Sequence, residues 1–408
     1  MNIASVSWGD HLTFGDGDGR LETPDALARR LDAWRTDLGA GALHWRMLRT
    51  RIPGRFSAAR GYRHPSEVAA ARIRWDDFEV VPRLARDAGL EPWLYVSVFD
   101  EGFPLASPRE RRTSHHNAMH GRHVAWQSDL TRLHPEWVMV DRTGRVRQQG
   151  VVCLAYAGAR RAFADRWMTL LDGTGFRGLF LCLRSQSRPA GHADQFGFNE
   201  PVRADFQSRF GCDILHQDFD VQAWRDLVGS YLTTLLCELQ QALRASGRRL
   251  AVGIPRGDVL GPPLGNTTLA WREWIGRGLV DALVVGQSSS QCPSMWHQLW
   301  PMHRGYGHLQ DYLSGRNLPP LTQYCAAVSA ASGDDSAHRT TLYIARQWSE
   351  RTSEGERGLL ATPGVAGLVF SSFRHDNPAA VARGDWRVAP DGTHVPATHV
   401  DGATKNTR

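Results

Sequence analysis

The sequence contains almost no lysine. Lys405 is the single lysine, so 47 of the 48 Lys and Arg residues are arginine. The arginines are spread along the whole chain, whereas proteins that bind nucleic acid commonly cluster their basic residues on one face or in a tail. The formal net charge of +6 therefore does not indicate a nucleic-acid partner. The planar guanidinium group remains well suited to hold carboxylates and sugar hydroxyls.

Cysteine pairs, long apolar runs and a leader sequence are missing as well. The six cysteines are scattered without CxxC spacing, which favours free thiols in a reducing compartment. No stretch approaches the roughly 20 apolar residues of a membrane span. The N-terminus lacks the basic and apolar regions of a signal peptide. We therefore predict a cytoplasmic protein without a membrane partner, although an exported protein whose leader had been trimmed would have the same sequence.

Short apolar runs alternate with helical patterns along nearly all of the 408 residues. The predicted strands are 3–8, 42–48, 92–99, 178–183, 250–254, 280–285, 320–325 and 367–373. The predicted helices are 24–38, 75–88, 159–171, 201–210, 221–245, 268–277, 295–313 and 337–353. Strands that alternate with helices indicate a parallel sheet covered by helices, so we predict an α/β fold, a (β/α)₈ TIM barrel. An open doubly wound sheet is the alternative, but no glycine-rich phosphate loop follows the first strand.

The predicted domain organisation is one catalytic barrel over residues 1–390, followed by a flexible tail over residues 391–408. Two long loops interrupt the alternation, one after the third strand (100–158) and one after the fourth (184–199). Loops of this length inside a compact domain usually carry function. We therefore expect these loops to contribute to the site.

Polar and aromatic side chains gather where the predicted strands end, which is the edge of a barrel at which active sites are assembled. Aromatic faces suit the apolar C–H faces of sugars, and amides, arginines and carboxylates suit their hydroxyls. This mixture predicts a carbohydrate ligand in place of a phosphate or an apolar one. The predicted substrate-binding residues are Trp8, Asp10, His44, Trp45, Arg46, Glu101, Arg184, Gln186, His192, Arg256, Gln287, Gln323 and Tyr324.

Three aspartates are the candidates for catalysis. Most glycosidases use two carboxyl groups, about 5–5.5 Å apart in retaining enzymes and about 6.5–9.5 Å apart in inverting ones. Asp258, just after the fifth strand, is the first candidate, and either Asp194 or Asp100 is its partner. Their spacing in the sequence does not show which carboxyl is the acid and which is the base or nucleophile.

A histidine-rich stretch lies in the first long loop and contains His115, His116, His120 and His123. His116 and His120 have the i, i+4 spacing of metal ligands on a helix. No glutamate stands between them as in an HExxH motif, and the surrounding segment is polar. We therefore interpret the stretch as a solvated lid and predict no metal and no other cofactor. A metal-dependent hydrolase that uses this stretch remains an alternative.

The stretch from Leu133 to Trp137 (LHPEW), with Asp141 and Gly144 after it, precedes a Cys153-Leu154-Ala155-Tyr156 segment at a helix start. This order resembles a segment of bacterial glycosyl hydrolases of the family-10-like barrel type. The resemblance continues through Phe196-Gly197-Phe198, Pro201-Val202, Phe206, Arg209 to Asp213 and Trp224-Arg225, and covers roughly residues 90–330. It implies a TIM-type barrel and a carbohydrate substrate.

The sequence departs from this type of barrel at two positions. The better-known clan has a glutamate acid/base at the end of strand 4 and a glutamate nucleophile at the end of strand 7. Here the predicted strands end in Leu183-Arg184 and Gln323-Tyr324. Either the carboxylates come from neighbouring strands or the protein has lost hydrolysis. We therefore predict a glycoside hydrolase acting on an oligo- or polysaccharide, with a non-catalytic carbohydrate-binding barrel as the main alternative.

Overall fold

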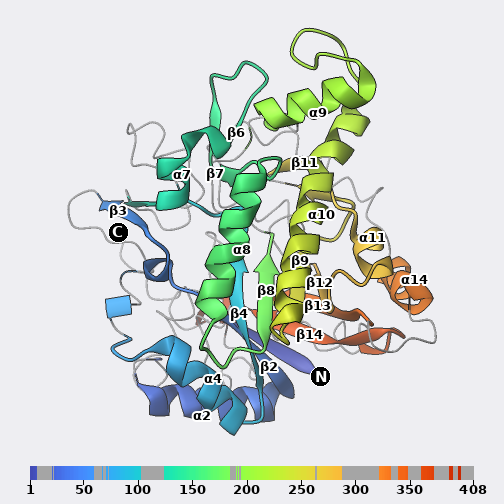
Figure 1. Ribbon diagram of the computed structural model, residues 1–408. Coiled ribbons are helices and arrows are strands. Elements are labelled where there is room, and N and C mark those ends of the chain that lie inside the picture. Colours follow the sequence, from blue (N-terminus) through green and yellow to red (C-terminus); the bar gives the residue numbers. More distant parts are fainter. Residues whose placement is uncertain are drawn as a thin grey trace, which may run out of the picture.

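A computed structural model describes most of the barrel and its attached hairpins. The described residues are 1–6, 21, 23–58, 67, 70–71, 73–102, 124–183, 190, 192, 194–261, 264–286, 321–331, 339–347, 360–371, 386–388 and 394–396. Figure 1 shows the arrangement of the elements.

Eight parallel strands close into a barrel, which confirms the predicted TIM-barrel fold (Figure 1). In sequence order they are β1 (Asn2–Val6), β2 (Ala40–Arg46), β4 (Glu91–Ser97), β8 (Gly178–Cys182), β9 (Arg249–Ile254), β12 (Ala282–Val285), β13 (Thr341–Gln347) and β14 (Val365–Ser371). Each strand pairs with the strands before and after it, and β1 closes the ring because Ser5 pairs with both His44 of β2 and Ser371 of β14. All strand carboxyl ends therefore point to the same rim of the barrel.

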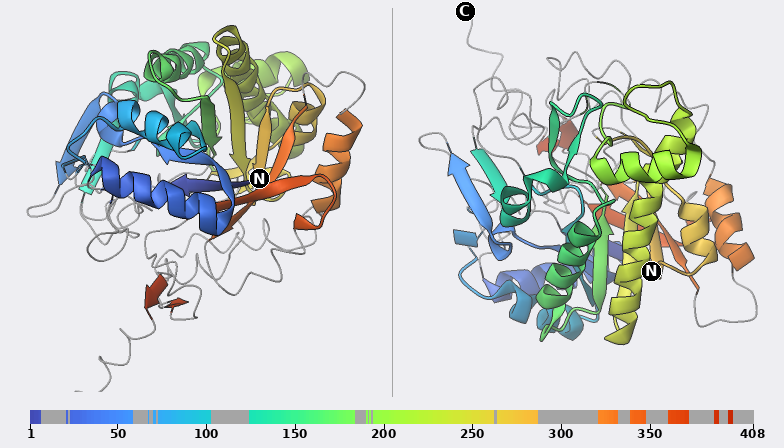
Figure 2. Two further views of the ribbon diagram at one scale, coloured as in Figure 1. Left: turned by 90° about the horizontal axis from the view of Figure 1, so that it is seen from below. Right: turned by 45° about the horizontal axis from the view of Figure 1, so that its top comes forward.

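Helices cover the outside of the strands, as the view from below in Figure 2 shows. They are α2 (Pro24–Leu38), α4 (Asp77–Asp87), α8 (Ala157–Leu171), α9 (Glu200–Phe210), α10 (Val221–Ala245), α11 (Trp271–Gly276) and α14 (Leu321–Ala331). Several of these helices begin after a residue whose side chain accepts hydrogen bonds from free backbone N–H groups of the first turn. Thr23 precedes α2, and its hydroxyl accepts a hydrogen bond from the backbone N–H of Ala26. The carboxylate of Asp220 accepts from two backbone amides at the start of α10. None of the helices in the described part of the chain is long and apolar enough to cross a membrane.

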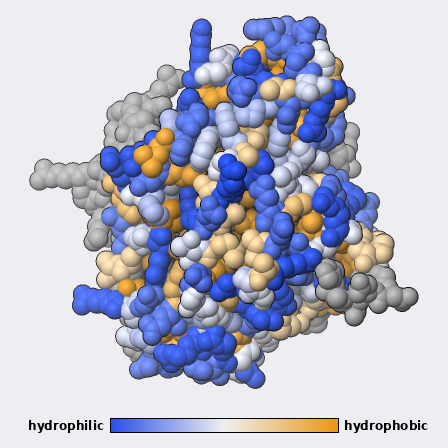
Figure 3. Space-filling view, in the orientation of Figure 1, coloured by the Kyte–Doolittle hydropathy of each residue, from blue (hydrophilic) through white to orange (hydrophobic). Residues whose placement is uncertain are grey.

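The core has two layers because side chains of a strand alternate between its two faces. Ala42 and His44 of β2 face the barrel interior, where Trp93, Tyr95 and Phe180 also lie. The other face of the strands packs against the helices, in a larger cluster that includes Leu43 and Trp45. The surface outside these layers mixes polar and apolar residues on the face seen in Figure 3.

The seventh strand is not where the sequence pattern placed it. Residues 320–325 were predicted as a strand, but Leu321–Ala331 form helix α14. The predicted helix 337–353 contains β13 instead, which lies between β12 and β14 in the barrel. Short apolar runs do not distinguish a buried strand from a buried helix by their periodicity. The alanines between Ala326 and Ala331 favour a helix, and the apolar run from Leu342 to Ala345 is fully consistent with a strand buried on both faces.

Additional elements are inserted after several barrel strands. β3 (Gly54–Ala58) pairs with β5 (Val124–Ser128), β6 (Val138–Val140) with β7 (Arg147–Val152), β10 (Val259–Gly261) with β11 (Gly265–Thr268), and β15 (Trp386–Val388) with β16 (His394–Pro396). Short helical turns are η1 (Arg49–Arg51), α7 (Asp129–Leu133) and η2 (Pro135–Trp137). The β6–β7 and β10–β11 hairpins and α9 follow the carboxyl ends of β4, β9 and β8, so they surround the rim of the barrel at which an active site is expected (Figure 1).

The residues that carried the family resemblance build the β6–β7 hairpin. His134 stacks on Trp137 with ring centroids 3.8 Å apart. The Asp141 carboxylate accepts from the amides of Arg145 and Val146, both at 3.0 Å, and so closes the turn between the strands. Gly144 completes this turn with a φ of 69°, a region that glycine adopts without strain. These contacts give the motif a structural role beside the barrel mouth.

Two helix glycines give a matched stability test. A Cβ on Gly229 in α10 would lie 2.2 Å from the carbonyl oxygen of Thr268, whereas a Cβ on Gly276 in α11 would meet nothing within 4 Å. We expect Gly229→Ala to lower the free energy of unfolding by about 1–3 kcal/mol, because α10 must move away from β11. Gly276→Ala is expected to raise it by up to about 1 kcal/mol. Urea titrations measure both values, and equal effects of the two substitutions would contradict this close packing.

Candidate active site

The structure places only part of the predicted site. Trp8, Asp10, Arg184, Gln186 and Gln287 lie outside the described residues, as does the stretch His115–His123. Their roles therefore stay predictions. The described candidates fall into three groups, one at β2 and β4, one beside α10, and one at the turn after β9.

The first group is a buried ion cluster at the carboxyl ends of β2 and β4. The Asp100 side chain is only 2% exposed, and its two oxygens are taken by different arginines. Arg46 Nη2 lies 3.3 Å from Oδ2, and an Arg49 guanidinium nitrogen donates to Oδ1. Arg46 also donates to the Ser97 hydroxyl at 2.8 Å. Asp100 thus holds together the two strand ends, and neither of its oxygens is open to a substrate.

Aromatic rings support the two arginines of this cluster. The guanidinium carbon of Arg46 lies 4.5 Å from the Tyr95 ring centre, and that of Arg49 lies 4.8 Å from the Trp126 ring centre. Stacking on a ring stabilises a cation that has left water. Burial lowers the pKa of Arg49, and the neighbouring Asp100 carboxylate opposes that shift. The cluster fits a positioning role at the barrel mouth better than proton transfer.

Glu101 does not share the environment of Asp100, although the two are adjacent in sequence. Its Oε1 accepts from Arg166 Nη1 of α8 at 2.7 Å, and the side chain is 2% exposed. Its Oε2 is buried without a hydrogen-bond partner among the described residues. The Glu101 side chain thus faces the helix layer and not the barrel mouth, and its substrate contact stays a prediction.

Trp45 faces the helix layer as well. Its ring is fully buried, and its indole N–H donates to Asp77 Oδ2 of α4 at 2.9 Å. Trp45 faces the helices because it alternates with the inward residues His44 and Arg46. It therefore cannot stack on a sugar ring in this arrangement.

His44 forms part of the interior packing one layer below Arg46. Its ring stacks on Phe180 at 4.0 Å between centroids and meets Trp93 edge-on at 6.4 Å. Its Nδ1 is buried without a hydrogen-bond partner in the described structure. Burial lowers the pKa of His44 to about 3. The imidazole is therefore neutral at ordinary pH and does not serve as a cationic contact.

The low pKa of His44 predicts a specific dependence of stability on pH. The unfolded chain takes up a proton near the ordinary pKa of 6.5, whereas the folded chain does so only near 3. Stability contributed by this group is complete above pH 6.5 and falls as the pH drops toward 3, by up to about 1.4 kcal/mol per pH unit. Between pH 7 and 4.5 the wild type should lose roughly 2–3 kcal/mol more than His44→Phe in urea titrations. The same loss in His44→Phe as in the wild type would contradict this, and exposed His216→Ala is the control.

The second group lies on the wall beside α10. Asp194, after β8, forms a bidentate pair with Arg225, with Nε to Oδ1 at 3.0 Å and Nη2 to Oδ2 at 2.6 Å. Both oxygens are thus occupied, although the side chain is 28% exposed. His192 is exposed nearby in the sequence. This geometry ties the loop after β8 to the start of α10.

The third group surrounds Asp258, in the turn between β9 and β10. Oδ1 of Asp258 accepts from Trp271 Nε1 at 2.7 Å and from Arg272 Nη1 at 2.9 Å. Oδ2 has no partner among the residues that the structure describes, and the side chain is 48% exposed. Of the three predicted catalytic carboxylates, Asp258 is thus the one that keeps an oxygen available. Arg256, two residues earlier, is half-buried in the same turn.

Gln323 and Tyr324 also belong to this third group, not to the end of a strand. Both lie on α14, since the predicted seventh strand is a helix. Gln323 Oε1 accepts from Arg272 at 2.8 Å, and the fully buried Tyr324 ring stacks on Trp271 at 4.0 Å. Tyr324 is therefore not available for direct sugar contact. The absence of a glutamate at Gln323 and Tyr324 therefore says nothing about the end of the seventh strand, because that strand is β13 and ends at Gln347.

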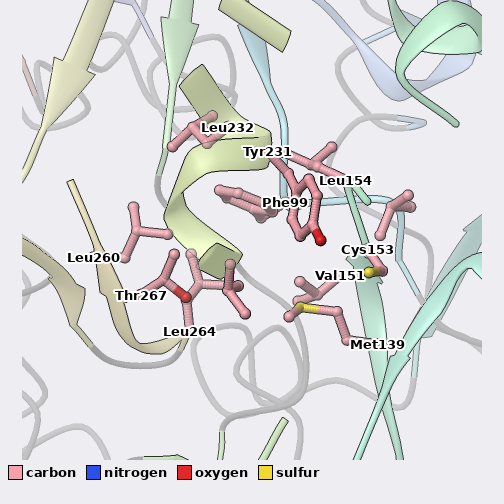
Figure 4. Close-up of a pocket in the computed structure, with 12 residues that line it drawn as sticks. Phe99, Met139, Val151, Cys153, Leu154, Tyr231, Leu232, Leu260, Leu264 and Thr267 are labelled. Carbon is pink, nitrogen blue, oxygen red and sulfur yellow. The ribbon is translucent and has the colours of Figure 1, made fainter. Parts of the chain in front are cut away.

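An apolar pocket lies beside the barrel mouth (Figure 4). The pocket lies between Phe99 after β4, the β6–β7 hairpin, α10 and the β10–β11 hairpin. Its volume is about 380 Å³ when the solvent at its opening is included. Tyr231 of α10 lines it, and its hydroxyl donates to Asp205 at 2.6 Å. Burial raises the pKa of Tyr231, and it raises that of the Cys153 thiol to about 12. Both groups are therefore protonated and give the pocket a neutral lining.

Within the described ranges, no group of three or more His, Cys, Asp or Glu side chains is arranged to hold a metal ion. The five cysteines that the structure describes are free thiols.

Several residues of these groups were not anticipated from the sequence. Arg49, Ser97, Arg225 and Arg272 each hold one of the predicted aspartates or its neighbour. Arg49 and Ser97 lie within three residues of Asp100 or Arg46, so their position near strand ends was a usable signal. Arg225 and Arg272 sit on helices, where sequence position alone does not show which loop they reach. Glu350 follows the true seventh strand, β13, by three residues in the sequence and lies outside the described residues.

Comparisons with known proteins find a similar fold among solved structures. No family model and no curated protein matches the sequence. Among solved structures, the PgaB (BpsB) glycoside hydrolase domain from Bordetella bronchiseptica matches with a TM-score of 0.51 and 15% identity, over 94% of this chain and 98% of that domain. An α-galactosidase from Lactobacillus brevis matches with a TM-score of 0.45 and 11% identity, over 93% of this chain but 39% of that protein. The likeness to the Bordetella domain shows a shared barrel fold along nearly the whole of both chains.

Proposed function

We propose that this chain is a glycoside hydrolase that binds an oligo- or polysaccharide at the carboxyl ends of its barrel strands. The observation that carries the proposal is the half-exposed Asp258, whose Oδ2 is available at the rim where barrel enzymes assemble their sites. The likeness to the Bordetella glycoside hydrolase domain over nearly its full length supports the proposal. The family-10-like resemblance is a finer assignment that stays a prediction.

In this proposal Asp258 is one of the two reacting carboxyl groups. Trp271 and Arg272 fix Oδ1, so that Oδ2 is directed to a glycosidic oxygen or to a water. Asp100 and Asp194 fit the role of the second carboxyl group less well, because each of their oxygens already accepts from a guanidinium group. We propose Glu350 for this role, since it is the first carboxyl-bearing residue after β13 in the sequence and active sites of such barrels use the segments that follow the strands. The separation between the two carboxyl groups decides between retention and inversion.

A glycan panel tests the proposed function. The panel contains neutral, acidic and amino-sugar oligosaccharides, and products are followed by the new reducing ends. We expect cleavage of at least one class, and loss of that cleavage in Asp258→Asn. If several glycans bind but none is cleaved, the chain is not a hydrolase.

A non-catalytic carbohydrate-binding barrel is the second candidate. It is favoured by the ion pairs of Asp100 and Asp194, in which every carboxylate oxygen already accepts from an arginine. Glycan binding with identical dissociation constants for wild type and Asp258→Asn, without cleavage by either, is the result that this candidate predicts.

A further inference from the structure

Helix α14 contacts the backbone of the Asp258 turn through one buried hydroxyl. The Gly257 N–H donates to Tyr324 Oη at 3.0 Å, and the same hydroxyl lies 3.4 Å from the Gly257 carbonyl oxygen, to which it donates. Gly257 has a φ of 141°, a conformation that side-chain-bearing residues rarely adopt. Glycine adopts this conformation without strain but can adopt many others, so contacts from its surroundings select this one. Tyr324 supplies such contacts on both polar atoms of Gly257.

The same helix reaches the Asp258 carboxylate through two side chains of α11. Gln323 accepts from Arg272 at 2.8 Å, and Arg272 donates to Asp258 at 2.9 Å. Tyr324 stacks on Trp271, which donates to Asp258 at 2.7 Å. Arg272 in turn lies over the Trp271 ring at 4.1 Å. Backbone and carboxylate of the turn are thus both held from α14.

The two contacts of the Tyr324 hydroxyl with Gly257 resist changes of pH. Burial raises the pKa of Tyr324 to about 12, so its hydroxyl stays protonated and can both donate and accept. The Asp258 Oδ1 atom is fixed by two donors, which leaves Oδ2 with one defined direction. Since an error of about 1 Å in the placement of a reacting group can cost about 100-fold in rate, such fixation matters for catalysis.

We propose that Gln323 and Tyr324 are positioning residues that aim the Asp258 carboxyl group at the substrate. This inference rests on the proposed function, because it assumes that Asp258 reacts with a substrate. The sequence-based expectation that these two residues bind sugar directly is thereby replaced by an indirect role through Gly257, Trp271 and Arg272.

The test combines a structural and a kinetic measurement on the full chain. Hydrogen exchange at the Gly257 amide should become about tenfold faster in Tyr324→Phe, which keeps the ring on Trp271 but removes the hydroxyl. On the most rapidly cleaved glycan of the panel, Tyr324→Phe and Gln323→Leu should lower kcat by about 10-fold to 100-fold with little change in KM. Gln323→Glu, which keeps an acceptor for Arg272, should restore most of the rate. Thr322→Ala, an exposed neighbour on the same helix, is the control.

Unchanged exchange at Gly257 in Tyr324→Phe would overturn the proposal. So would an unchanged kcat in both Tyr324→Phe and Gln323→Leu while Asp258→Asn is inactive. If the wild type cleaves no glycan, the proposed function fails, and the exchange measurement then decides alone whether α14 holds the turn.

Discussion

Replacing Asp258 by asparagine is expected to lower turnover at least about 100-fold on any glycan that the wild type cleaves. Asparagine has the same shape, and its carbonyl oxygen can still accept from Trp271 and Arg272, which hold Oδ1 in the wild type. The atom that changes is the available Oδ2, which becomes an amide that neither gives nor takes a proton at ordinary pH. The loss should therefore fall on kcat, with KM within a few-fold of the wild-type value.

Asp194→Asn is the matched comparison. Like Asp258, Asp194 is an aspartate that follows a barrel strand and forms an ion pair with an arginine of a helix. Both of its oxygens bind Arg225, so its substitution should reduce kcat by less than about tenfold. Glu350→Gln should reduce kcat as severely as Asp258→Asn if Glu350 is the second carboxyl group. An Asp194→Asn variant as inactive as Asp258→Asn would refute this assignment.

Replacing Asp100 by alanine is expected to lower the free energy of unfolding by about 3–5 kcal/mol. The substitution leaves Arg46 and Arg49 buried beside each other without the carboxylate that both contact. The loss of a buried ion-pair partner is far more costly than a lost surface contact, because the remaining charges have little access to water. The barrel should therefore unfold at a clearly lower urea concentration.

The exposed pair of Arg83 and Asp87 provides the control for this prediction. Their side chains are 57% and 65% exposed and lie 3.9 Å apart. Asp87→Ala should change the free energy of unfolding by less than about 1 kcal/mol, since water screens such pairs. If Asp100→Ala also stays within about 1 kcal/mol of the wild type in urea titrations, the buried cluster does not stabilise the barrel.

The fold was largely predictable because a (β/α)₈ barrel repeats one local pattern. Strands such as 178–183 and 250–254 are short apolar runs bounded by helices with clear start and stop signals, for example Thr23 before α2 and Pro24 as its first residue. The seventh strand was misplaced because β13 and the start of α14 are both short apolar runs near each other in sequence. Their assignment depends on which run can pair with β12 and β14, a long-range property that periodicity does not contain.

The candidate site was harder to predict, because proximity to a strand end does not fix the direction of a side chain. Arg46 faces the barrel mouth and its neighbour Trp45 faces α4, a difference that strict alternation along β2 does predict. Beyond the strand end this rule fails, so Asp100 and Glu101 reach different layers in a way that only the loop geometry determines. Partners from distant helices, such as Arg272 for Asp258, depend on tertiary packing.

A structure of Asp258→Asn with an oligosaccharide of the cleaved class bound tests the central claim most directly. The account predicts a sugar across the carboxyl ends of the barrel strands, with the residue at position 258 within about 2.6–3.2 Å of the glycosidic oxygen or of a water beside the anomeric carbon. A sugar bound elsewhere on the molecule, with the turn after β9 free of ligand, would contradict it.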